Sequence, residues 1–149
     1  MRKTIYQTIK AFLLVCLVIL GACQKEKNNS PANNCPMNIS TIAGNYSITS
    51  IKYKVNEAPE QDYMQFMDAC ERDDIIFLSA NGTYNHMDKG KVCSPDGNET
   101  GTWSLNGNKI TSDDYINGTI EKFDCKVLVI YIPDIFVPGD RMTFVFTRE

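Results

Sequence analysis

From Gly44 onward, short runs of alternating apolar and polar residues are separated by turn-forming residues. Successive side chains of a strand point to opposite faces, so a period of two is typical of strands with one buried face. Short strands at this spacing, bounded by Gly, Pro and Asn, favour an antiparallel all-β domain. This pattern limits the fold more than any other feature of the sequence.

Eight segments follow this pattern, and they are 46–55, 73–80, 83–89, 99–105, 108–112, 115–122, 127–132 and 141–147. The first changes phase near Ser50, which predicts a β-bulge or a bend. The dipeptide Asn-Gly at 81–82 and at 106–107 predicts tight hairpin turns, because both residues tolerate positive φ. A two-residue turn at 106–107 would place Trp103 opposite Ile110.

The period changes in residues 58–70, between the first two strands, where Tyr63, Phe66 and Met67 recur at helical spacing. This spacing predicts one short amphipathic helix. Eight consecutive antiparallel strands favour an up-and-down barrel, because closing the sheet removes its exposed edges. A partly open barrel and two packed sheets remain as alternatives.

The N-terminus has the pattern of an export signal. Arg2, Lys3 and Lys10 are followed by an apolar run over 11–20. A charged start, a short apolar run and small residues before a cut site indicate a secretory signal peptide over 1–22. The run is about half of the roughly 20 residues that span a bilayer, so we do not expect a permanent membrane span.

The signal ends in Leu20-Gly21-Ala22-Cys23, which resembles the lipobox of bacterial lipoproteins. The resemblance implies that Cys23 becomes the first residue and carries acyl chains such as palmitate, which anchor a protein stably when more than one is present. Gln24 follows instead of the Asp of some inner-membrane lipoproteins, which favours the outer membrane of a Gram-negative bacterium. Whether the domain faces the periplasm or the outside stays open.

Residues 23–40 are polar and contain proline, so we expect a flexible, lipidated tether before one domain over 41–149. The full chain has 15 Lys and Arg against 18 Asp and Glu, and the signal removes three basic residues, which leaves a net charge of −6. An acidic chain of this kind argues against nucleic acid or anionic lipid as a partner.

Four stretches resemble the small lipocalin-like domains of bacterial lipoproteins. They are IAGNYSITSI, DACERDDIIFLSANGTY, GTWSLNGNKIT and MTFVFTRE, and together they extend over nearly all of residues 42–149. The resemblance implies a β-barrel that can hold an internal pocket, and it implies no catalytic residues.

Four cysteines remain after Cys16 of the signal and Cys23 are set aside, and they are Cys35, Cys70, Cys93 and Cys125. An even number in an exported chain indicates two disulfides. A zinc site does not fit, because the cysteines are far apart in sequence and His86 is the single histidine.

The barrel topology predicts which cysteines pair. Alternate connections of a meander lie at opposite ends, so Cys35 and Cys125 would share one end and Cys70 and Cys93 the other. The two ends are separated by strands of about 20 Å, whereas a disulfide requires Cα atoms within about 7 Å. We therefore predict the pairs Cys35–Cys125 and Cys70–Cys93.

No arrangement of residues indicates catalysis. His86 would lie opposite Phe77 in a hairpin, which favours a locally bonded strand histidine. The acidic residues near the end of the helix lack the spacing of a calcium loop and suit a solvated rim; they are Asp68, Glu71, Asp73 and Asp74. We therefore predict a non-enzymatic protein that uses no metal or cofactor.

Two functions remain. An eight-stranded barrel is either filled by side chains or just wide enough for one small ligand. In a tethered carrier or sensor of a small apolar molecule, the ligand contacts would be Tyr63, Met64, Phe66, Met67 and Trp103. In a filled barrel, the domain would serve as a structural or protein-interaction module of the cell envelope. A cavity of a few hundred Å³ would favour the carrier. The sequence identifies neither a protein partner nor an oligomeric state.

Overall fold

The computed structural model describes residues 35–113 and 116–149; the predicted signal peptide, Cys23 and most of the tether lie outside them. The strands are β1 (Gly44–Val55), β2 (Gln61–Asp62), β3 (Ile75–Leu78), β4 (Thr83–Met87), β5 (Glu99–Asn106), β6 (Lys109–Ser112), β7 (Asn117–Phe123), β8 (Val127–Pro133) and β9 (Asp140–Arg148). Helix α2 (Ile39–Ile42) precedes β1, and the 3-10 helix η2 (Met64–Phe66) follows β2.

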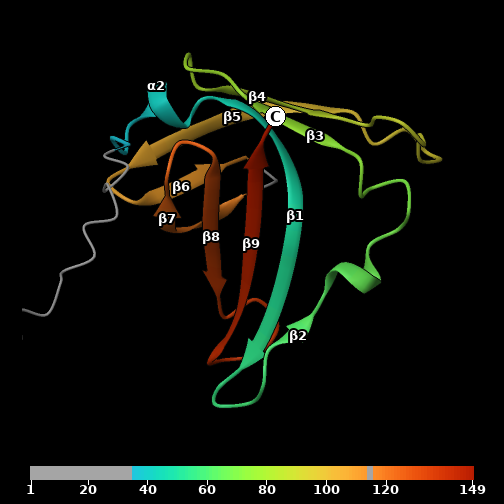
Figure 1. Cartoon of the computed structure of the whole chain (residues 1–149), viewed down its shortest axis with the longest axis vertical. Coiled ribbons are helices and arrows are strands. Elements are labelled where there is room, and N and C mark those ends of the chain that lie inside the picture. Colours follow the sequence, from blue (N-terminus) through green and yellow to red (C-terminus); the bar gives the residue numbers. More distant parts are fainter. Residues whose placement is uncertain (1–34, 114–115) are drawn as a thin grey trace, which may run out of the picture. The chain divides into compact units, whose positions relative to one another are not determined.

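The strands form one antiparallel sheet in the order β2-β1-β3-β4-β5-β6-β7-β8-β9. Strands β1 and β9 lie side by side along most of their length and also pair, which closes the sheet (Figure 1). The result is the predicted eight-stranded up-and-down barrel of β1 and β3–β9, with the two-residue β2 added beside β1. Because each of the eight barrel strands pairs with the next barrel strand along the chain, no crossover connection is needed.

The predicted irregularity near Ser50 is a register shift in β1. Ile48 pairs with Phe146, and Ile51 pairs with Phe144. Directly paired residues share a face of the sheet, so the shift keeps Ile48 and Ile51 on the inner face although they are three residues apart. An unbroken strand would turn one of them outward.

The core fills the barrel with apolar side chains from α2 and from every barrel strand. Its buried members are Ile42, Tyr46, Ile76, Leu78, Tyr84, Trp103, Ile110, Ile116, Ile120, Leu128, Ile130 and Phe146. Within single strands these residues alternate, as Leu128 and Ile130 do on β8, because the period of two places them on the inner face. Removing this apolar surface from water is the main driving force for folding.

Helix α2 and the end of β9 seal one end of the barrel, here called the α2 end. The guanidinium of Arg148 donates hydrogen bonds to the carbonyls of Thr41, Ile42 and Ala43 and, at 2.8 Å, to the hydroxyl of Tyr46. It also lies over the Tyr46 ring, 5.3 Å from its centroid. A cation suits this position, because the last carbonyls of a helix lack partners within the helix.

One predicted hairpin register is wrong by two residues. Leu105 pairs with Ile110 and Trp103 with Ser112, so the turn consists of residues 107–108. Gly107 has φ +61°, which suits the first position of a type II′ turn and explains the shift. A change of register by two residues keeps each side chain on the same face of the sheet, so Trp103 still points into the core.

The amphipathic helix expected over 58–70 is present only as the single 3-10 turn η2, after β2. The backbone of this segment hydrogen-bonds to β1 instead, since Tyr63 N–H donates to the Ile51 carbonyl at 2.9 Å. Strand pairing therefore overrides the helical spacing. No helix within residues 35–113 and 116–149 is long and apolar enough to cross a membrane.

Both predicted disulfides are confirmed. Cys35 and Cys125 join at the α2 end with a Cα separation of 5.6 Å, and Cys70 and Cys93 join at the opposite end of the strands with 5.2 Å. The sequence separations are 90 and 23 residues, respectively. The first bridge attaches the N-terminal segment to the β7–β8 connection, and the second joins two long loops.

Replacing both cysteines of either bridge by serine should lower the free energy of unfolding. Chain-entropy arguments give a loss of about 3 kcal/mol for Cys70–Cys93 and about 1 kcal/mol more for Cys35–Cys125, because the latter closes a longer loop. Urea titration of the two double variants measures the difference. Equal losses, or a larger loss for Cys70–Cys93, would contradict the loop-length argument.

Candidate binding site at the barrel mouth

An apolar cavity lies inside the barrel between the core and the end opposite α2. Its volume is about 80 Å³, and its lining residues are Ile48, Ile116, Ile132, Phe144 and Phe146. They come from β1, β8, β9 and the connection before β7, and none of them carries a charge. The cavity can therefore hold an apolar group and offers it no side-chain hydrogen bond.

The volume limits what this cavity can hold. Drug-sized ligands usually occupy pockets of roughly 300–1,000 Å³, and a dry apolar cavity of about 150 Å³ takes a benzene molecule. The 80 Å³ of this cavity suit a smaller group, such as a few carbon atoms at one end of a ligand. Any larger part of the ligand must contact residues nearer the opening.

The inner faces of β1 and β9 lead from the cavity to the opening of the barrel. From the α2 end outward, the inward residues of β9 and their partners on β1 are Phe146 with Ile48, Phe144 with Ile51, and Met142 with Tyr53. Ile48, Phe146 and Phe144 of the first two pairs line the cavity. Tyr53 belongs to the next level and marks the start of the mouth, which is formed by residues 53–67 and 134–139.

Four aromatic rings form a contiguous group at the mouth, here called the mouth cluster: Tyr53, Tyr63, Phe66 and Phe136. The Tyr63 ring lies 5.8 Å from Tyr53, 4.9 Å from Phe66 and 6.1 Å from Phe136, and Tyr53 lies 5.4 Å from Phe136. These centroid distances are those of favourable tilted ring pairs. Phe66 is 63 % exposed and Phe136 56 % exposed, so half of the cluster faces solvent.

Asp140 holds the loop between β8 and β9 in place. Its Oδ1 accepts a hydrogen bond from Ile135 N–H at 2.7 Å, and its Oδ2 accepts from Phe136 N–H at 3.0 Å and from Val137 N–H at 2.9 Å. The Tyr53 hydroxyl also donates to Oδ2, at 2.8 Å. One carboxylate, 2 % exposed, thus fixes two members of the mouth cluster.

These contacts shift the pKa of both partners. Burial alone would raise the pKa of Asp140, but the hydrogen bonds from Val137, Tyr53, Phe136 and Ile135 together hold this pKa below its ordinary value. Burial and the adjacent Asp140 carboxylate raise the pKa of Tyr53 above its ordinary value. At neutral pH the carboxylate is therefore charged and the phenol is protonated, as the hydrogen bond requires.

The structure brings together most of the residues predicted to contact a ligand. Tyr63 and Phe66 belong to the mouth cluster, and Met64 and Met67 are partly buried in the same segment. Trp103 lies apart from them in the core, where its indole Nε1 donates to the Ser79 carbonyl at 2.8 Å. The cavity lining does not include Trp103.

Sequence reasoning missed Tyr53, Phe136 and Asp140. Their contacts link β1 to a loop more than 80 residues later, and neither hydrophobic period nor spacing reveals such contacts. One local signal was present, however. The segment Ile135-Phe136-Val137 is apolar although it lies between the strands predicted over 127–132 and 141–147, and apolar residues gathered on a surface loop can mark a contact site.

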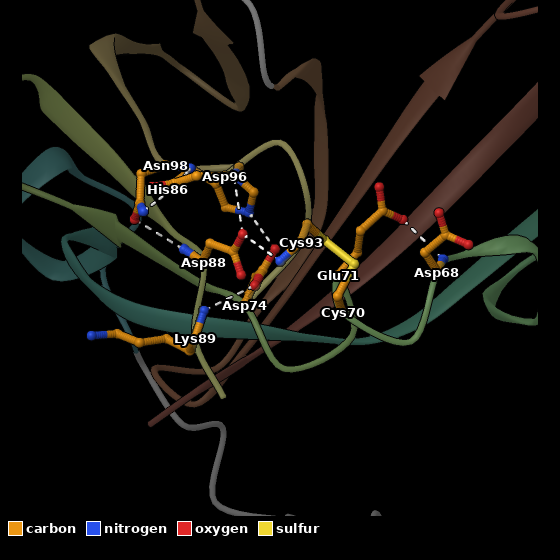
Figure 2. Close-up of polar contacts among 11 residues, drawn as sticks. Asp68, Cys70, Glu71, Asp74, His86, Asp88, Lys89, Cys93, Asp96 and Asn98 are labelled. Atoms are coloured by element: carbon orange, nitrogen blue, oxygen red, sulfur yellow. Dashed lines mark hydrogen bonds and ion pairs between the residues drawn. A yellow bond between two sulfur atoms is a disulfide. The ribbon is translucent and has the colours of Figure 1, made fainter. Parts of the chain in front are cut away.

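A polar cluster lies beside the Cys70–Cys93 disulfide (Figure 2). His86 Nε2 is 3.2 Å from Asp74 Oδ2, and Asp74 Oδ1 accepts a hydrogen bond from Lys89 N–H at 3.1 Å. Asp88 Oδ2 accepts from Cys93 N–H at 2.9 Å. The cluster therefore connects β3 and β4 to the loop that carries the disulfide.

His86 has the local, bonded position expected of a strand histidine, but it pairs with Ile76 and not with Phe77. Ser79 N–H donates to the Thr83 carbonyl, so the turn contains three residues instead of two. Burial raises the pKa of Asp74; the hydrogen bond from Lys89 and the charge of His86 act in the opposite direction.

The other acidic residues of this region also bind backbone groups. Glu71 accepts a hydrogen bond from Asp68 N–H at 3.0 Å (Figure 2), and Asp73 accepts one from Lys91 N–H at 3.0 Å. Among the described residues, no group of three or more His, Cys, Asp or Glu side chains is arranged to hold a metal ion. These carboxylates serve to order the loops.

Replacing Asp140 by asparagine should lower thermal stability at neutral pH and flatten its dependence on pH in acid. A carboxylate whose folded pKa is depressed stabilises the fold above its unfolded pKa, and this contribution is lost as the pH falls through the folded value. Melting temperatures measured from about pH 7 to about pH 2 test this. Asp68→Asn, at an exposed position, is the matched control. If the melting temperature of Asp140→Asn fell with acid as steeply as that of the wild type, the Asp140 carboxylate would not have the stabilising role described here.

The comparison with protein families agrees with this architecture. A family model described as a lipocalin-like domain matches residues 42–130, from the last residue of α2 into β8. The match extends over more than half of the chain. No curated protein matches the sequence.

Proposed function

The chain belongs to the lipocalin-like domain family, and from this premise we propose that it is a lipid-anchored envelope protein that binds a small apolar ligand at the barrel mouth. The observation that carries the proposal is the apolar cavity lined by Ile48, Ile116, Ile132, Phe144 and Phe146. It lies inside the barrel, toward the end opposite the α2 end.

The proposed ligand places a few carbon atoms in the cavity and its remaining part against the mouth. Met64 and Met67 lie beside the mouth cluster, and methionine side chains adapt to apolar surfaces of varied shape. Tyr53 supplies an aromatic surface one level above the cavity. The small volume favours a narrow or short ligand over a bulky one.

The anchor in this proposal is the acylated Cys23, which lies outside the described residues. Cys35 is attached to Cys125 at the α2 end. The segment before Cys35 therefore joins the barrel at the end opposite the mouth. An extended chain of 12 residues spans at most about 40 Å, and this distance sets how far the barrel can stand from an anchor at Cys23.

A second function is favoured by the small volume of the cavity. Because 80 Å³ is well below the usual size of a ligand pocket, the barrel can also be regarded as filled. In that case the domain acts as a structural or interaction module of the envelope, and the exposed rings of the mouth cluster provide its contact surface.

The substitution Ile132→Phe tests the ligand proposal, because it fills the cavity from β8. Native mass spectrometry of protein isolated from its own host should show a bound apolar ligand, and Ile132→Phe should reduce its occupancy at least about tenfold. Val129→Phe is the matched control, since Val129 lies on the same strand and outside the apolar core. The control should retain the ligand.

If the isolated wild-type protein carries no ligand, the carrier proposal fails and the filled barrel is supported. Equal loss of the ligand in both variants would also contradict the assigned cavity, because only one of the two side chains points into it.

Replacing Cys23 by serine tests the anchor. In the wild type, the N-terminal peptide of the mature protein should begin at residue 23 and carry the mass of acyl chains. Cys23→Ser should carry no acyl mass, and the chain should not be cut before residue 23. Cys16→Ser should be processed like the wild type, and an unmodified Cys23 in the wild type would exclude the lipoprotein.

A further inference from the structure

The mouth presents exposed apolar side chains on two neighbouring loops. Phe66 is 63 % exposed, Phe136 56 % and Val137 45 %. Tyr63 connects the two loops, with its ring 4.9 Å from Phe66 and 6.1 Å from Phe136. Single exposed apolar residues are common on proteins, but contiguous exposed rings mark a contact surface.

A polar groove of about 430 Å³ lies next to these rings, on the outer side of the mouth. Its charged lining residues are Lys54, Glu60, Asp134, Asp140 and Arg141, and the lining also includes Asn56 and Tyr131. Asn56 and Glu60 lie in the segment that leads to Tyr63 and Phe66, and Asp134 lies in the loop that carries Phe136 and Val137. The groove and the exposed rings are thus formed by the same two segments.

Backbone contacts hold the two segments together. Asn56 N–H donates to the Gly139 carbonyl at 3.2 Å, and Gly139 N–H donates to Asp134 Oδ1 at 2.7 Å. Asn56 and Asp134 adopt positive φ, at 47° and 53°, a conformation that Asn and Asp tolerate better than other non-glycine residues. A rigid surface of this kind can bind without a large cost of ordering.

The groove carries charges of both signs. Among the described residues, neither Lys54 nor Glu60 forms an ion pair or a side-chain hydrogen bond. Arg141 lies over the Tyr131 ring at 5.1 Å and pairs with Glu121 at 3.2 Å. An uncompensated cation and an uncompensated anion complement a group that itself carries both charges, such as a phosphate linked to an ammonium.

From this combination we propose that the mouth docks on a zwitterionic phospholipid surface, a role beyond ligand binding. The phosphate of a headgroup lies toward Lys54 and Arg141, and its ammonium lies toward Glu60. Phe66, Phe136 and Val137 enter the boundary between headgroups and acyl chains, where aromatic residues are favoured. The mature chain is acidic, so an anionic surface would repel it.

The test uses the mature chain, residues 23–149, with Cys23→Ser so that no acyl chain contributes to binding. It is mixed with vesicles of phosphatidylcholine and phosphatidylethanolamine, and bound protein is measured by flotation. The double variant Phe66→Ser/Phe136→Ser should bind at least about tenfold more weakly, since burying each ring in an apolar environment favours binding. Met37→Ser removes a 41 % exposed side chain near the α2 end and should bind like the parent chain.

Lys54→Gln and Glu60→Gln should each weaken binding several-fold, and added salt should have little effect on the parent chain. Phe66, Phe136 and Glu60 are exposed and Lys54 is half-buried, so unchanged melting temperatures will show that the variants fold. Three results would each overturn the proposal: no binding to zwitterionic vesicles, binding restricted to anionic vesicles and abolished by salt, or full binding by the double phenylalanine variant. A protein partner bound through these rings without vesicle binding would overturn it as well.

Discussion

The pairing of β1 with β9 is the interaction on which the rest of the structure depends. It runs from Tyr46 with Arg148 to Val55 with Asp140 and closes the sheet. Closure leaves no long unpaired edge, and it places the two ends of β9 at opposite ends of the barrel. At one end Arg148 binds the carbonyls of α2, and at the other Asp140 orders the loop that carries Phe136. A single strand therefore supports both the sealed end and the mouth.

Much of this fold could be predicted from the sequence, because the signals are local and repeated. The period of two located the strands, and the even number of cysteines together with the meander determined both disulfides. The sequence-based predictions that fail concern segments for which two local structures compete. The segment around Tyr63 has helical spacing but pairs with β1, and the turn near Gly107 is displaced because its φ of +61° suits another turn position.

The candidate site was predicted only in part, for a physical reason. Tyr63 and Phe66 are close in sequence, so their common surface could be recognised. Tyr53, Phe136 and Asp140 meet only because the barrel closes, and no local pattern reports a contact of that range. Trp103 was predicted to contact the ligand, whereas its place on β5 puts it in the core. The pairing of β1 with β9 thus decides which of these aromatic residues meet at the mouth.

The Cys35–Cys125 bridge also has a mechanical consequence. Tension on the N-terminal segment would pass through a covalent bond into the β7–β8 connection and be shared by these two paired strands. Helix α2 and the first residues of β1 would be bypassed by that force. The mouth, at the opposite end of the barrel, would therefore lie farthest from the point at which such a force enters.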